Sequence, residues 1–248
     1  MTATDTNAWG RPYYEAGHGD ALLVYVVFGT LNTEAPFSLS KYRVNAVRQD
    51  VVPTRRPIEQ STGWFDVAPF AKDPAVVAAA KASSECIVLM GTVADPPDLG
   101  YLRDTVGTVQ WLLDNGGVAV LDPQTFNWLS AADFTSTFFA SGKPEVTQHV
   151  DILVSKEPGE ATAWYHTRGL RKFGRPDLSV RGVTEAMQKD AEEALNRFIY
   201  FQQLGGFIRE GVELNLRTMT GYVAKHGGSL DDPDFNNVHV ELVKPSTK

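Results

Sequence analysis

The 248-residue sequence has only one cysteine, Cys86, so an internal disulfide is excluded. Cys86 begins the apolar run CIVLM, where a thiol behaves as a small buried hydrophobe, and a catalytic thiol is not expected. Long apolar runs are also lacking, since stretches such as Ala21–Phe28 are far shorter than the roughly 20 residues that span a bilayer. The sequence therefore predicts neither a disulfide framework nor a transmembrane helix.

Positive charge is in deficit. The chain has 23 lysines and arginines against 30 aspartates and glutamates, which gives a net charge of −7 at pH 7. This balance disfavours unspecific attraction to nucleic acid and to anionic lipid surfaces. The N-terminal stretch also lacks the cationic start and continuous apolar centre of a secretory signal. We therefore expect a cytoplasmic protein whose partners include neither nucleic acid nor a membrane.

Common motifs of catalysis are missing as well. The sequence has no G-x-S-x-G elbow, no G-x-x-x-x-G-K-S/T loop, no H-E-x-x-H helix and no paired C-x-x-C. It is nevertheless an ordinary globular sequence, with 43% apolar and 21% charged residues. Its length lies near the upper size of a single domain. We expect one folded domain over residues 20–248, preceded by a loosely ordered arm over 1–19.

Apolar runs and capping residues outline the first half of the chain. Three runs predict buried strands that lie in one sheet: Ala21–Phe28, Cys86–Val93 and Val118–Leu121. Helix starts are predicted at Asp73, Asp98, Ser130 and Thr184. The pattern between residues 29 and 70 is weak, and Pro53 and Pro57 predict a break in any regular element there.

The second half predicts a hairpin formed by Val150–Val154 and Ala161–His166, which turns through Pro158 and Gly159. A long helix from about Thr184 to Leu204 is then expected to bury Met187, Ala191, Leu195 and Phe198. The predicted fold class is α+β, with a largely antiparallel mixed sheet and helices packed mainly on one side. The predicted elements follow a similar order over residues 20–145 and 146–248. A fold of two similar halves is therefore an alternative to a single undivided sheet.

A basic loop follows the second strand of the hairpin. Its candidate site residues are His166, Arg168, Arg171, Arg175 and Asp177. The planar arginine fork suits carboxylates and phosphates, so this loop is expected to bind an anionic group of a ligand or of the same chain. Because no glycine-rich phosphate cradle opens a helix nearby, a structural role is favoured over ligand binding.

An acidic segment, Asp231–Glu241, supplies candidate metal ligands. They are Asp231, Asp232, Asp234, His239 and Glu241. Oxygen ligands at this density suit a divalent cation, but the spacing fails the EF-hand pattern because Asn237 stands where glycine is needed. An Asx-rich turn that leads into a strand explains the same residues without a metal. No cofactor is therefore predicted.

Four stretches of the chain resemble a bacterial family of uncharacterised cytoplasmic proteins, a domain of unknown function. They are GVAVLDPQT, HTRGLRKFGRPDLSV, NRFIYFQQLGG and DDPDFNNVHVE. The resemblance covers mainly residues 110–243. It implies a bacterial, single-domain, soluble protein, and it implies no activity, cofactor or catalytic residue.

Two functions of different class remain open from the sequence, and so does the oligomeric state. The missing nucleophile and cofactor motifs favour a non-enzymatic interaction or binding module, immunity-type or regulatory, with a protein partner. The alternative is a metal-assisted hydrolase of an anionic phosphate or carboxylate substrate. It would hold a divalent cation on the acidic segment and the substrate on the arginines of the basic loop.

Charge predicts that the basic loop and the acidic segment meet, with Arg168, Arg171 and Arg175 facing the acids. Each gathers like charges whose repulsion the other would relieve. Direct contact through closed pairs of carboxylates and guanidinium groups, with no cavity between the loops, would indicate a structural clasp and favour the interaction module. An open pocket into which His166 or His239 points would favour ligand binding or catalysis.

Overall fold

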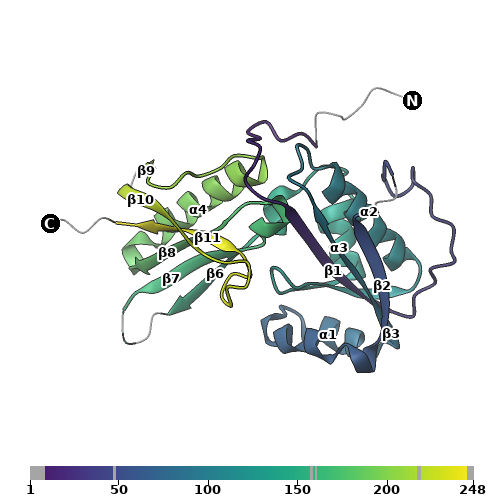
Figure 1. Cartoon of the computed structure of the whole chain (residues 1–248). Coiled ribbons are helices and arrows are strands. Elements are labelled where there is room, and N and C mark those ends of the chain that lie inside the picture. Colours follow the sequence, from purple (N-terminus) through teal and green to yellow (C-terminus); the bar gives the residue numbers. More distant parts are fainter. Residues whose placement is uncertain (1–8, 47–48, 157–158, 160, 217–218, 245–248) are drawn as a thin grey trace. The chain divides into compact units, whose positions relative to one another are not determined.

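The structure is a computed structural model that describes residues 9–46, 49–156, 159, 161–216 and 219–244. The chain folds into two compact units. The first unit contains residues 9–10 and Ala21–Glu145, and the second contains Arg11–Asp20 and the chain from Val146 onward. Each unit has its own sheet, so the fold is α+β with one antiparallel and one mixed sheet (Figure 1).

The sheet of the first unit has the strand order β2-β3-β1-β4-β5, and every neighbouring pair is antiparallel. The strands are β1 (Ala21–Gly29), β2 (Val51–Pro57), β3 (Glu85–Val93), β4 (Gly117–Asp122) and β5 (Asn127–Ser130). β1 lies at the centre because nearly all its side chains are apolar and suit a strand that is covered on both faces. The three predicted strands lie in this sheet and are mostly buried, which confirms that prediction.

Helices cover both faces of the first sheet, where the sequence suggested mainly one face. On one face, α1 (Pro74–Lys81) packs Ala80 into a core with Phe28, next to the 3₁₀ helices η1 (Ile58–Gln60) and η2 (Thr62–Phe70). On the other face, α2 (Gly100–Asp114) packs mainly on β1 and β4. The short α3 (Ala131–Phe134) continues into the π-helix η3 (Thr135–Phe139).

Two predicted caps are formed in the first unit. The Asp73 Oδ1 atom accepts a hydrogen bond from the Ala75 amide at 2.8 Å, and Pro74 fills the first position of α1. The Ser130 Oγ atom accepts a hydrogen bond from the Asp133 amide at 3.1 Å and so caps α3. Local sequence signals therefore fix the start of both helices.

The prediction that Pro53 and Pro57 break regular structure is wrong, because both lie within β2. Among the described residues, β2 is an edge strand that pairs with β3 alone, so each proline faces one neighbouring strand. A proline on an edge can direct its missing N–H to the open side without losing a ladder hydrogen bond. Edge position, which the sequence does not show, decides this case.

The sheet of the second unit has the order β6-β7-β8-β11-β10-β9 and is mixed, because β8 and β11 run parallel. Its strands are β6 (Asp151–Lys156), β7 (Ala163–Arg168), β8 (Asp177–Val183), β9 (Glu213–Leu216), β10 (Met219–Gly228) and β11 (Val238–Val243). The predicted hairpin corresponds to β6 and β7, while Pro158 of its turn lies outside the described residues. β8 was not predicted, although it occupies the middle of the sheet.

The predicted long helix is α4 (Gln188–Gln203), preceded by the 3₁₀ helix η6 (Glu185–Met187). Ala191 and Leu195 are buried as expected, but Met187 and Phe198 are only half-buried, and Ile199 is buried instead. Thr184 precedes the helix without a side-chain capping bond. Among the residues that the structure describes, no helix combines the length and apolar character needed to cross a membrane.

Residues 11–20 pack within the second unit. The Tyr13 amide donates to the Leu204 carbonyl at 2.9 Å, and the Glu15 amide donates to the Gly205 carbonyl at 3.1 Å. The Arg11 side chain is buried and donates to the Phe173 carbonyl at 2.8 Å. This part of the predicted N-terminal arm is therefore joined to the end of α4 and to the basic loop.

Candidate functional site

The basic loop joins β7 to β8 through η5 (Leu170–Phe173), and two glycines shape it. Gly169 and Gly174 have φ of 115° and 62°, which a residue with a side chain rarely adopts. A Cβ atom at Gly174 would also lie 2.2 Å from the carbonyl oxygen of Gly19. Both positions therefore require glycine, and the loop turns so that Arg171 and Arg175 reach different parts of the unit.

The basic loop and the acidic segment are in direct contact, as predicted. The Arg168 side chain donates to the backbone carbonyl of Asp234. The Arg171 Nη1 atom donates to the carbonyls of Leu230 and Asn236 at 3.2 and 2.7 Å. Arg171 also donates to the Asn236 Oδ1 atom at 3.2 Å. The acceptors are thus uncharged oxygens of the segment and of the adjoining Leu230, whereas the sequence led us to expect carboxylates. We call this contact the clasp.

Arg175 does not face the acidic segment, so that part of the prediction is wrong. Its side chain is 1% exposed, and its guanidinium donates to the carbonyls of Glu15, Gly174, Gly205 and Gly206 at 2.7–3.0 Å. A planar fork with five donors can satisfy several carbonyls at once. Arg175 therefore binds the 11–20 segment and the end of α4 to the loop, which is a structural role.

Asp177 is buried between the basic loop and the acidic segment and is hydrogen-bonded to both. Its buried carboxylate accepts hydrogen bonds from the Thr167 hydroxyl and the Asn237 amide, both at 2.8 Å, and from the Leu170 amide at 3.3 Å. Burial raises the pKa of Asp177 to about 6, although these donors oppose the rise. The carboxylate is therefore enclosed by the chain itself.

The two histidines of the predicted site lie in an aromatic stack. His166 stacks on Trp164 with ring centroids 4.0 Å apart, and His239 stacks on Phe235 at 4.2 Å. Burial, helped by the Arg168 charge, lowers the pKa of His166 to about 4. The Nδ1 atoms of both histidines are buried and have no hydrogen-bond partner among the described residues. Because its pKa is lowered, the stacked His166 imidazole is neutral at neutral pH, which suits packing better than proton transfer.

The candidate metal ligands are not gathered around one point. Asp231 and Asp234 are exposed, and Asp232 uses its Oδ1 atom to accept the amides of Asp234 and Phe235 at 3.0 and 3.3 Å. His239 Nδ1 lies 3.9 Å from Asp232 Oδ2. Glu241 lies 3.6 Å from Arg181. Within the described ranges, no three histidine, cysteine or acidic side chains are placed to hold a metal ion.

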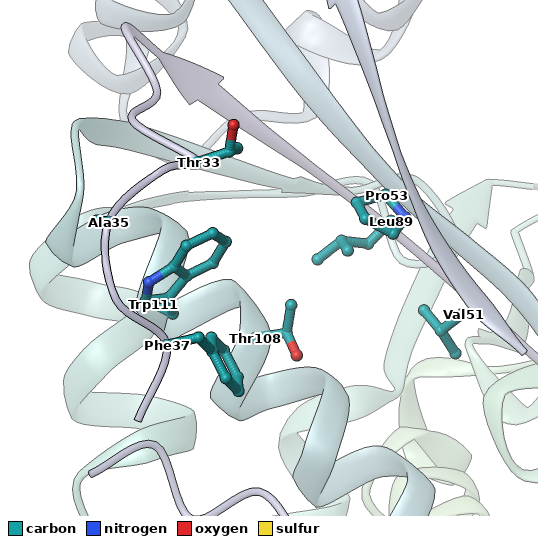
Figure 2. A pocket seen from close by; sticks show the side chains of 8 residues that line it. All are labelled: Thr33, Ala35, Phe37, Val51, Pro53, Leu89, Thr108 and Trp111. Carbon is teal, nitrogen blue, oxygen red and sulfur yellow. The ribbon is translucent and has the colours of Figure 1, made fainter. Parts of the chain in front are cut away.

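The first unit contains a pocket that the sequence did not indicate (Figure 2). It is a cavity of about 250 Å³ between α2 and the edge of the sheet formed by β2 and β3. Its lining residues are Thr33, Ala35, Phe37, Val51, Pro53, Leu89, Thr108 and Trp111. The space exists because α2 packs mainly on β1 and β4, which leaves the β2 and β3 side of this face to a loop.

That loop, residues 33–37, forms the roof of the pocket. Thr33, Ala35 and Phe37 are half-buried, whereas Glu34 and Pro36 between them are exposed. The backbone turns at residues 33–35, and every second side chain of the loop is directed inward. Phe37 meets Trp111 edge to face, with centroids 5.3 Å apart at 78°. The roof therefore rests on the aromatic side chain of α2.

The two threonine hydroxyls at the pocket wall are engaged elsewhere, whereas the buried Nε1 atom of Trp111 has no hydrogen-bond partner among the described residues. The Thr108 hydroxyl donates to the Asp104 carbonyl of its own helix at 2.9 Å, and Figure 2 shows it turned toward the helix. The Thr33 hydroxyl accepts from Arg55 at 2.9 Å, and Arg55 also binds both carboxylate oxygens of Glu85. The surface offered to a ligand is therefore apolar and partly aromatic.

Sequence patterns could not reveal the pocket, because its residues come from four separate elements and carry no motif. Trp111 is half-buried at the pocket wall, and its sequence neighbourhood of aliphatic residues is that of an ordinary core position. The alternation over residues 33–37 is too short to stand out in the sequence. Only the placement of α2 on the sheet brings these side chains together.

No family model matches the chain, and neither a curated protein nor a solved structure matches it. The resemblance to a bacterial family of uncharacterised proteins therefore stays a prediction. The function has to be argued from the clasp and the pocket alone.

Proposed function

We propose that this protein is a non-enzymatic binding module, and that its ligand or partner places an uncharged apolar group in the pocket of the first unit. One observation carries the proposal. All eight lining residues lack an acid, a base or a free nucleophile, while they enclose a cavity of about 250 Å³. Apolar pockets with convergent walls are the usual form of a ligand site. Holding a molecule without transforming it suits a regulatory module.

The clasp supports the same proposal. A substrate-binding role for the basic loop would need arginine donors that are free to grip an anion. Arg171 instead binds the acidic segment, and the four carbonyls around Arg175 hold that side chain within the second unit. The two loops touch through hydrogen bonds from the arginines to uncharged oxygens, which favours a structural contact although it is not the set of carboxylate and guanidinium pairs that we expected. The alternative, a metal-assisted hydrolase, keeps one argument, because a hollow of about 400 Å³ is lined by Pro176 of the basic loop, by His239 of the acidic segment and by His226. Within the described ranges, however, no three histidine, cysteine or acidic side chains are placed to hold a metal ion.

Mapping of backbone amide shifts tests the proposal. The ¹⁵N-labelled full chain is titrated with a library of small fragments, half of them uncharged and apolar and half charged. We expect shifts to cluster in residues 33–37 and in α2 near Thr108 and Trp111, and only with uncharged fragments. Shifts that cluster at the clasp with anionic fragments would contradict the proposal and favour the hydrolase.

Matched variants of the roof make the test specific. Ala35→Leu adds bulk on the inward side of the roof, whereas Glu34→Leu adds a leucine to the exposed side of the same segment. The fragment shifts should disappear in Ala35→Leu and persist in Glu34→Leu. Equal shifts in both variants would place the binding site outside the pocket.

A further inference from the structure

We propose that the ligand of this pocket is an uncharged, planar aromatic molecule of one or two fused rings, an inference that rests on the proposed function. The size of the cavity sets the first limit. An engineered cavity of about 150 Å³ in another protein binds benzene. At the same cavity volume per ligand atom as for benzene, about 250 Å³ holds a molecule of roughly ten non-hydrogen atoms. A dinucleotide or a haem would not fit.

The two facing walls of the pocket favour a flat ligand. Figure 2 shows Trp111 and Phe37 on one side, and Leu89, Pro53 and Val51 on the other. Aromatic rings add offset or edge-to-face contacts to the gain from burial, and flexible chains do not make these contacts. A flexible chain also loses rotamer freedom when it is enclosed. A rigid ring between an aromatic and an aliphatic wall therefore binds best.

The lack of charged side chains in the pocket lining favours an uncharged ligand. None of the lining residues is charged. Arg55 beside the roof is occupied by Glu85 at 3.0 and 2.9 Å and by the carbonyl of Leu31 at 2.9 Å. A charged ligand would lose its hydration here and find no free counter-ion.

The edge strand argues against a peptide as the occupant. A peptide that pairs with the edge of a sheet depends on the backbone donors of that edge. β2 contains Pro53 and Pro57, which have no N–H, so its edge offers few donors. Pro53 is itself exposed and lines the pocket, so it marks the mouth through which a small molecule enters.

Calorimetric titration of the full chain with three compounds tests this inference. Indole is the neutral planar probe, 1-octanol has the same number of non-hydrogen atoms in a flexible chain, and indole-3-carboxylate carries a charge. We expect indole to bind about tenfold more tightly than 1-octanol and at least about tenfold more tightly than indole-3-carboxylate. Octanol that binds as tightly as indole, or a carboxylate that does so, would overturn the inference.

Two variants of Thr108 assign the binding to the pocket. Thr108→Leu adds bulk on the pocket wall, while Thr108→Ser keeps the hydroxyl that binds the Asp104 carbonyl. Indole affinity should fall about tenfold or more in the leucine variant and stay within about threefold in the serine variant. If circular dichroism shows that Thr108→Leu is unfolded, Ala35→Leu replaces it.

The outcomes separate this inference from the proposed function. If 1-octanol binds best and Thr108→Leu abolishes its binding, the aromatic preference is wrong and the binding module stands. If none of the three compounds binds and the fragment library shifts no pocket amide, both are wrong. If Thr108→Leu binds indole as the parent does, indole sits elsewhere and the inference is wrong.

Discussion

Arg175 shows how one side chain can hold three segments of a unit together. Its buried guanidinium donates to carbonyls of the 11–20 segment, of its own loop and of the glycines that follow α4. A lysine keeps the charge but has no planar fork, so Arg175→Lys leaves buried carbonyls without donors. We expect the free energy of unfolding, measured with urea, to fall by about 2 to 4 kcal/mol.

The matched control is Arg197→Lys, because the Arg197 side chain is 65% exposed and pairs with Glu193 of its own helix. A substitution on the surface should change the free energy of unfolding by no more than about 0.5 kcal/mol. Equal effects of the two substitutions would show that Arg175 does not hold the segments together.

Asp177 should make the protein less stable as the pH rises. Its pKa in the folded state is about 6, above the ordinary value of 3.8, because the carboxyl is buried. The folded chain therefore keeps this proton where the unfolded chain has lost it, and stability falls between about pH 4 and 6. A shift of this size corresponds to about 3 kcal/mol. Urea unfolding at several pH values should show this fall in the parent and not in Asp177→Asn. Parallel curves would contradict the assignment.

His166 should act in the opposite direction over a similar range. Its pKa in the folded state is about 4, below the ordinary 6.5, so the unfolded chain takes up a proton that the folded chain rejects. Stability therefore rises with pH from about 4 to 6.5 and is lost again as the pH falls. His166→Gln has no such proton and should flatten this rise in the same urea series. An unchanged slope would show that the imidazole titrates normally.

At the scale of elements, α4 carries the clearest prediction. Ile199 is 2% exposed and lies on the buried face of the helix, whereas Phe198 is half-buried. Ile199→Ala should lower the free energy of unfolding by about 2 to 4 kcal/mol, and Phe198→Ala should lower it by less. The denaturant midpoints of the two variants decide this. A larger loss for Phe198→Ala than for Ile199→Ala would instead support the buried face that the sequence predicted.

The sequence located α4 correctly but misjudged its buried face, for a physical reason. Gln202 and Gln203 are fully buried, and the Gln202 amide donates to the Pro176 carbonyl at 3.0 Å. Polarity alone marks glutamine as a surface residue, because the sequence does not show the carbonyl that satisfies it. The sequence therefore predicted Phe198 on the buried face of α4 and did not include Gln202 and Gln203 in that face.

Strands were predictable where the sequence has an apolar run, and less so where buried positions carry polar residues. β1, β3 and β4 are continuous apolar runs, so the sequence identified them. β8 starts at Asp177 and ends in the run Arg181–Val183, so its pattern is mixed, although it lies between two other strands. The pocket could not be predicted at all, since it results from how α2 and residues 33–37 lie on the sheet.

For the whole molecule, ligand binding should be visible as stability. A ligand that binds only the folded state, at a hundred times its dissociation constant, stabilises it by about 2.7 kcal/mol. We expect this gain for indole with the parent chain in urea unfolding, and little or none with Ala35→Leu. An equal gain in both chains would place the binding outside the pocket.

The central claim is that the chain binds an apolar molecule in this pocket and leaves it unchanged. A proton NMR time course of indole with catalytic amounts of protein, recorded over a day, tests both parts together. We expect the indole signals to broaden with the parent chain and with Glu34→Leu, not with Ala35→Leu, and no product signals to arise. New signals that grow with time would show an enzyme, and equal line widths with all three chains would show that the pocket does not bind.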